Sequence, residues 1–158
     1  MAQPTSDETP MYQEEQSNLP LMIAIYAVML AFGVLGLVTA GAGAKEGWSI
    51  ILVLALIFPI VIRAFSRMRI VVTSSEIRFG FPAIHKRLPI SKVRLGEVVD
   101  LKWWYGIGVH FVFTRWVYNT RLGQGVEVYG NGTRYIIGSR DPGKLKFYIS
   151  SALSQRSQ

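Results

Sequence analysis

The sequence predicts an α+β protein, mainly β, in which an N-terminal transmembrane helical hairpin precedes an antiparallel β sandwich or open barrel with one C-terminal capping helix. Three observations predict this fold. Two long uncharged runs lie between residues 19 and 62, the following residues alternate between apolar and polar, and a helical period returns only after Ser139. The predicted divisions are a disordered acidic tail (1–18), the hairpin (19–64), the β domain (65–154) and a C-terminal tail (155–158).

Charge is distributed unevenly along the 158 residues, whose formal net charge is +7. Residues 1–18 hold four acidic side chains and no base, whereas residues 63–158 hold 16 Lys or Arg and five Asp or Glu. The chain has no cysteine. Thiol catalysis, disulfides and thiolate metal sites are therefore excluded.

The first uncharged run, residues 19–43, is 25 residues long and as a helix would measure roughly 37 Å, enough to cross a bilayer with some tilt. The second run, residues 48–62, just reaches the spanning minimum when its neighbours are included. Pro59 removes one backbone donor, which is tolerated when a neighbour or water satisfies the freed carbonyl. Small residues at Gly36, Ala40 and Ala44 favour close helix packing, either within the hairpin or in a dimer.

Arg63, Arg67 and Arg69 follow the second run, whereas only Lys45 lies between the runs. The positive-inside rule therefore predicts a multi-pass protein of the cell (inner or plasma) membrane with both termini in the cytoplasm. A cleaved signal peptide is the alternative, because residues 40–44 contain small-residue cleavage patterns. The acidic tail and the length of the first run argue against it.

The β domain carries two clear local signals. Gly130-Asn131-Gly132 separates two alternating segments and predicts a tight hairpin, because Asn-Gly supplies the positive φ angles that such a turn needs. After Ser139, Asp141 can cap a helix that has Pro142 in its first turn. Apolar residues then recur at helical spacing, at Leu145, Tyr148, Ile149, Ala152 and Leu153.

Several motifs resemble those of small bacterial membrane proteins in which a transmembrane hairpin precedes a pleckstrin-homology-like (PH-like) domain. They lie at residues 72–77, 88–93, 106–108, 116–119 and 137–142. The resemblance covers residues 19–153 and implies seven strands, a capping helix and a role at the membrane. It departs from lipid-binding eukaryotic relatives, because the turn at Thr73-Ser74-Ser75 lacks the bases that hold phosphoinositide phosphates there.

No catalytic signature is present: the sequence contains no GxSxG, HExxH or GxxxxGK[ST] motif. His85 and His110 are 25 residues apart without a nearby acidic partner, so we expect neither a metal nor a cofactor. The bases are spread over strands without a recognition helix, which argues against nucleic acid as a partner. We therefore expect a protein that is not an enzyme.

The most unusual segment is residues 103–113, in which five of eleven residues are aromatic and none is charged. We take the five aromatic residues of this segment as candidate site residues: Trp103, Trp104, Tyr105, Phe111 and Phe113. Three interpretations remain open: core packing, a loop in the bilayer interface, or a patch that binds a protein.

The bases suggest a second candidate surface, one that contacts an anionic leaflet. Its residues are Arg63, Arg67, Arg69, Lys86, Arg87, Lys92 and Arg94, together with Lys102. An ordinary solvated face is the alternative.

We expect a non-enzymatic, membrane-anchored PH-like interaction module at the cytoplasmic face that binds a membrane protein partner or itself. The alternative function is a sensor of the anionic lipid surface that works through the basic face.

Overall fold

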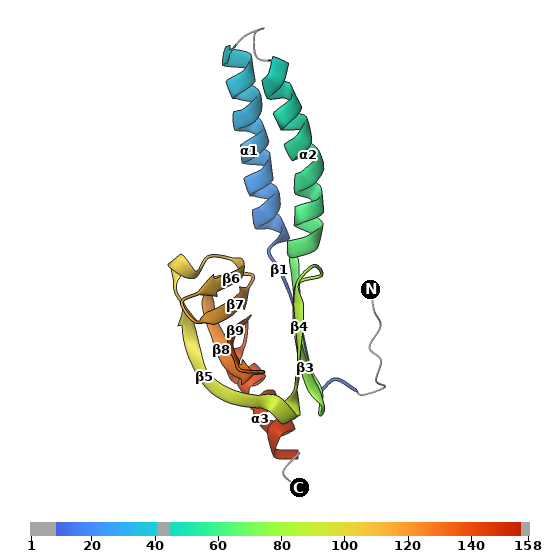
Figure 1. Cartoon of the computed structure of the whole chain (residues 1–158), viewed down its shortest axis with the longest axis vertical. Helices are drawn as coiled ribbons and strands as arrows, with labels where there is room; N and C mark the ends of the chain where they lie inside the picture. Colours follow the sequence, from blue (N-terminus) through green and yellow to red (C-terminus); the bar gives the residue numbers. More distant parts are fainter. Residues whose placement is uncertain (1–8, 41–44, 156–158) are drawn as a thin grey trace.

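The structure is a computed structural model that describes residues 9–40 and 45–155. Two long helices, α1 (Leu19–Ala40) and α2 (Lys45–Phe65), extend from a β domain of two sheets and a C-terminal helix (Figure 1). The predicted α+β class, with two long helices, a β domain and a C-terminal helix, is confirmed. Of the predicted C-terminal tail, Gln155 is the last residue of a helix, and residues 156–158 lie outside the described residues.

Both helices are long and apolar enough to cross a membrane, over Leu19–Thr39 and Gly47–Phe65. Large apolar side chains such as Phe32 and Leu56 are exposed along them, which is unfavourable in water and expected in lipid. Where α1 packs on α2, the close approach is at Gly33 and not at Gly36. A Cβ on Gly33 would lie 3.2 Å from Ile51, whereas Gly36 faces open space. Residues 41–44, the expected end of the first run and of its small-residue ridge, lie outside the described residues.

Pro59 lies inside α2 and cannot donate to the carbonyl of Ala55, four residues earlier. The Tyr26 hydroxyl of α1 donates to that same carbonyl at 3.1 Å, and the Tyr26 ring stacks on Phe58 with centroids 5.1 Å apart. An unsatisfied carbonyl is costly in hydrocarbon. The expectation that a neighbour compensates for Pro59 is therefore confirmed, and the compensating bond also joins the two helices.

The first sheet is antiparallel and has the order β1-β2-β3-β4. Its strands are β1 (Tyr12–Ser17), β2 (Arg67–Val72), β3 (Glu76–Gly80) and β4 (His85–Pro89). β1 precedes both helices and β2 follows them, yet they pair from Tyr12 opposite Val72 to Ser17 opposite Arg67. The two helices are therefore inserted between neighbouring strands of one sheet.

The prediction of a disordered tail over residues 1–18 is wrong for residues 12–17, which form β1. The strand escaped the sequence pattern because two of its core-facing side chains, Glu14 and Gln16, are polar, so the apolar alternation of a half-buried strand is missing. Residues 1–8 lie outside the described residues.

Polar side chains of β1 join the first sheet to the second. Buried Gln16 donates to the carbonyl of Gly138 at 2.8 Å and accepts a hydrogen bond from the Thr120 hydroxyl at 2.5 Å. Glu14 accepts a hydrogen bond from the Ser139 hydroxyl at 2.6 Å. These partners lie 104 to 125 residues away along the chain, so β1 connects segments that are distant in the sequence.

The second sheet has the order β5-β8-β9-β7-β6. Its strands are β5 (Val93–Leu101), β6 (Gly108–Val112), β7 (Arg115–Asn119), β8 (Gly123–Gly130) and β9 (Thr133–Ser139). The described residues thus form nine strands instead of the seven that the resemblance implied. The expectation of a fully antiparallel domain is also wrong, because β7 and β9 pair in parallel. After β5 the chain crosses to the opposite edge to form the β6–β7 hairpin, and β8 and β9 then fill the space between.

The core lies between the sheets and is closed by α3 (Pro142–Gln155). Met68 and Ile77 from the first sheet and Val126 from the second are fully buried. The predicted helix is confirmed: Leu145, Ile149 and Ala152 are buried, and the Asp141 carboxylate accepts a hydrogen bond from the Lys144 amide at 2.9 Å.

The predicted tight hairpin is also confirmed. β8 and β9 pair up to Gly130 opposite Thr133, so only Asn131 and Gly132 form the loop. Their φ angles of 51° and 73° are both positive, as a type I′ turn requires.

We expect Gln16→Ala to lower the free energy of unfolding by about 1 to 3 kcal/mol, because it removes two buried hydrogen bonds between the sheets. Gln13→Ala, at an exposed position on the same strand, is the matched control and should change it by less than about 0.5 kcal/mol. Urea denaturation of the full chain in detergent, followed by near-ultraviolet circular dichroism, measures both. Equal stability of the two variants would contradict a stabilising role for Gln16.

Candidate functional site

Trp103 and Trp104 begin a single 3-10 turn, η3 (Trp103–Tyr105), directly after β5. Their side chains are 76% and 53% exposed, and their rings meet edge to face with centroids 5.8 Å apart. The Lys102 ammonium lies 4.9 Å above the Trp104 ring, a cation–π contact. The core interpretation is therefore wrong for these two residues, and an exposed role remains for them.

Tyr105 differs from its two neighbours. It is partly buried and packs against a small cluster of Leu101, Val117 and Ile136 on the second sheet. Its ring fastens η3 to the sheet, so a substitution of Tyr105 would disturb the fold as well as any contact made by the tryptophans.

The β6–β7 hairpin carries the other exposed rings. Phe111 and Trp116 lie opposite each other in the ladder, with ring centroids 5.2 Å apart, and both are exposed. Phe113, in the turn, is 81% exposed and has a positive φ of 57°. Sequence reasoning missed Trp116 as a site residue, although its cross-strand position opposite Phe111 follows once the hairpin is known. We call Trp103, Trp104, Phe111, Phe113 and Trp116 the aromatic set.

Asn119 fixes the loop between η3 and β6. Its side chain is fully buried, its amide donates to the Gly106 carbonyl at 2.8 Å, and its carbonyl oxygen accepts from the Gly108 amide at 3.1 Å. Gly106 and Gly108 both have positive φ angles, which a side chain would strain. The aromatic rings are therefore presented from a defined loop.

The loop and β6 lie at the end of the β domain that faces the helices. In Figure 1 the segment between β5 and β6, coloured yellow to gold, and the label β6 are at the level where α1 and α2 leave the domain. β6 is the edge strand of its sheet on this side. The loop that follows Trp103 and Trp104 thus belongs to the part of the domain nearest to the apolar helices.

The structure separates the seven bases that were expected to form one surface. Arg63 lies in the last turn of α2, and Arg67 lies opposite Ser17, the last residue before Asn18 and α1. Lys86 is the second residue of β4 and lies close to the β3–β4 turn. This turn contacts α2, because the Ala83 amide donates to the carbonyl of Ala64. The helix-proximal bases, Arg63, Arg67, Arg69 and Lys86, share this end of the domain.

Lys92 and Arg94 lie beyond the opposite end of the first sheet, in the 3-10 turn η2 (Ile90–Lys92) and in β5. They follow Pro89, which pairs with Glu76 at the other end of β3, roughly 13 Å from Gly80 at 3.3 Å per residue. Arg87 lies between the two groups. Lys92 and Arg94 instead line a shallow cavity of about 160 Å³ beside the β8–β9 turn. This volume is below the roughly 300 Å³ at which small-molecule sites begin.

Glu127 on β8 is the centre of a charged cluster. It is 5% exposed, accepts a hydrogen bond from the Tyr129 hydroxyl at 2.8 Å, and forms ion pairs with Arg134 and Arg115. Burial by itself raises the pKa of a carboxyl group, but hydrogen bonds from Arg134 and Tyr129 and the two positive charges hold the pKa of Glu127 below its usual value. Glu127 is thus held as a carboxylate and acts as a structural anchor for the sheet.

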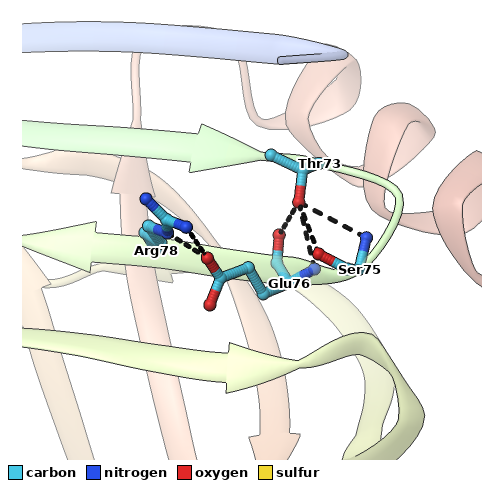
Figure 2. A network of polar contacts seen from close by, with 4 residues as sticks. All are labelled: Thr73, Ser75, Glu76 and Arg78. Carbon is cyan, nitrogen blue, oxygen red and sulfur yellow. Dashed lines mark hydrogen bonds and ion pairs between the residues drawn. The ribbon is translucent and has the colours of Figure 1, made fainter. Parts of the chain in front are cut away.

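Figure 2 shows the β2–β3 turn, at which the sequence lacks bases. The Thr73 hydroxyl donates to the Glu76 carbonyl at 3.2 Å and accepts a hydrogen bond from the Glu76 amide at 3.1 Å. The guanidinium of Arg78, the nearest base on β3, pairs with the Glu76 carboxylate. The turn is closed by its own polar groups, and it lies at the end of β2 and β3 away from the helices.

The described residues contain no group of three or more His, Asp or Glu side chains that could hold a metal ion. Within the same residues, Glu97 pairs with Lys146 at 2.6 Å, and Asp100 accepts a hydrogen bond from Gln124 at 3.0 Å. Both acids therefore engage neighbouring side chains.

No protein-family model, curated protein or solved structure matches this chain. The class of protein that the structure itself defines is an α+β chain in which two helices, each long enough to span a membrane, are inserted into the first sheet of a β sandwich closed by a C-terminal helix.

Glu127 should make stability sensitive to acid. Folding lowers the pKa of Glu127. Its ionised carboxylate therefore makes its full contribution to the free energy of unfolding when the pH is above the pKa of the unfolded chain, about 4.3. This contribution is lost as the pH falls through the lower pKa of the folded chain. We expect Glu127→Gln to cost about 1.5 to 3 kcal/mol at neutral pH. The difference from wild type should shrink as the pH falls from about 5 to about 3.

Urea denaturation at a series of pH values measures this difference. Glu97→Gln is the control, since the Glu97 side chain is 83% exposed in its pair with Lys146. A wild-type advantage that stays constant down to low pH would contradict the assignment of the lowered pKa to Glu127.

Proposed function

We propose that this protein is a non-enzymatic interaction module anchored in a bacterial cell membrane. The helices α1 and α2 cross the bilayer as a hairpin and hold the β domain at the cytoplasmic face, where it binds a membrane protein partner or a second copy of the chain. The observation that carries this proposal is the β1–β2 ladder at the base of the hairpin.

The ladder constrains how the helices can cross a membrane. Paired strands lie about 4.8 Å apart, so residues 12–17 and 67–72 must be on the same side of any bilayer. This supports two crossings over one, including the shorter α2. Arg63, Arg67 and Arg69 lie at the end of α2 and directly after it, whereas Lys45 is the one base at the opposite end of the hairpin, which supports the cytoplasm as that side.

The architecture supports the PH-like interpretation in part. Two packed sheets followed by one closing helix agree with it, whereas nine strands and the parallel β7–β9 pair depart from it. The exposed groups described at the helix-facing end include aromatic rings and bases, which supports binding.

Site-directed labelling tests the orientation, because the natural chain has no cysteine. Gln13→Cys on β1 and Ser150→Cys on α3 are exposed positions, and Ala42→Cys lies between the helices in the sequence. In spheroplasts, an impermeant maleimide should label only Ala42→Cys, and lysis should expose the other two. Labelling of Gln13→Cys and Ser150→Cys from opposite sides would contradict the hairpin.

A second candidate function, a sensor of anionic lipid, is favoured by the helix-proximal bases. Arg63 and Lys86 are exposed beside the ends of the helices, while Arg67 and Arg69 both pair with Glu15. Near-surface bases contribute about 1 kcal/mol each to the attraction of an anionic leaflet. Arg63 and Lys86 are therefore the residues on which such sensing would depend most.

We expect the double variant Arg63→Gln with Lys86→Gln to lose about 2 kcal/mol of affinity for anionic lipid, or roughly thirtyfold. Lys92→Gln with Arg94→Gln removes the same charge from the helix-distal end and should have little effect. The readout is the phosphatidylglycerol retained per chain after mild detergent extraction. Equal retention by the two variants would contradict the surface-sensing function.

A further inference from the structure

We propose that the aromatic set is seated in the interfacial layer of the same bilayer that α1 and α2 cross, as a second membrane contact of the β domain. This inference rests on the proposed anchor and names the lipid interface as the occupant of that surface. A partner protein would then bind the faces of the domain that remain in water.

The connections between helices and strands hold the domain at the membrane. Only Asn18 lies between β1 and α1, and only Ser66 lies between α2 and β2. The Asn18 amide donates to the Ser66 carbonyl at 3.0 Å, so the two connections are also bonded to each other. Phe81, at the β3–β4 turn, packs on Phe65 of α2 with centroids 6.0 Å apart. The domain therefore has no linker that would let it move away from the ends of the helices.

Trp103 and Trp104 lie in η3, directly before the loop that leads to β6. This loop and β6 are at the level where the helices leave the domain (Figure 1). The headgroup layer adds about 5 to 7 Å to each side of the hydrocarbon core. An exposed ring at the ends of the spanning helices is thus within reach of this layer without a change in the fold.

The chemistry of the set suits an interface better than water. Trp and Tyr concentrate at membrane interfaces, where an apolar ring meets lipid and a polar edge stays hydrated. Trp103 and Phe113 are among the most exposed large side chains of the β domain, at 76% and 81%. Lys102, stacked on Trp104, adds a positive charge where lipid phosphates would lie. The helix-proximal bases lie at the helix-facing end of the first sheet.

Tryptophan fluorescence of the reconstituted full chain tests the inference. The chain has four tryptophans, so Trp48→Phe with Trp116→Phe leaves Trp103 and Trp104 as reporters. The matched variant, Trp103→Phe with Trp104→Phe and Trp116→Phe, leaves Trp48 of α2. Each is placed in vesicles of phosphatidylcholine and phosphatidylglycerol that carry bromine at a shallow or a deep acyl position.

We expect shallow bromines to quench Trp103 and Trp104 by about twofold or more, and deep bromines to quench them less. Quenching of Trp48 without quenching of Trp103 and Trp104 would overturn the inference and leave the anchor intact. If Trp48 were also unquenched, the anchor itself would fail. Protection of Trp103 and Trp104 from acrylamide without quenching by lipid would overturn the inference in favour of a protein partner or a second copy.

Discussion

Backbone hydrogen bonds between β1 and β2 are the interaction on which the rest of the structure depends. They join the residues that enter the helical hairpin to the residues that leave it, and so close a loop of some fifty residues at its base. With one residue between each strand and its helix, the direction of the ladder sets the direction in which the helices leave the domain. The two helices and the β domain are therefore joined through one sheet and not by a flexible linker.

The same strand explains why polar side chains are buried near the anchor. Gln16 and Glu14 form hydrogen bonds to Thr120, Gly138 and Ser139, at the ends of β7 and β9. A buried polar group without a partner is costly, so these bonds favour one alignment of β1 across the two sheets. An apolar β1 could slide along the core more easily, because apolar contacts have no fixed direction.

Local chemistry explains which parts of the fold were predictable. The hairpin of helices, the Asn131-Gly132 turn and the capped helix α3 depend on residues close in sequence, and each was predicted correctly. β1 and the parallel pairing of β7 with β9 depend on partners far along the chain, and no period within a single segment encodes them.

The candidate site divides in the same way. Composition alone marked Trp103, Trp104, Phe111 and Phe113, which are all exposed. The packing of Tyr105 against Leu101, the pairing of Trp116 with Phe111 and the separation of Lys92 and Arg94 from Lys86 each required the strand order. When a surface is formed by several strands, the sequence can indicate its individual residues but not which of them lie together.

The bond from Tyr26 to the Ala55 carbonyl has a mechanical consequence. It occupies the one backbone acceptor that Pro59 leaves open, and stacking of Tyr26 on Phe58 restricts the same turn of α2. In a bilayer, rotation of α2 about its own axis would leave that carbonyl without a donor in hydrocarbon, which is energetically unfavourable. The bond and the stacked rings therefore couple α1 to α2, so that a displacement of one helix is transmitted to the other and to the sheet at their base.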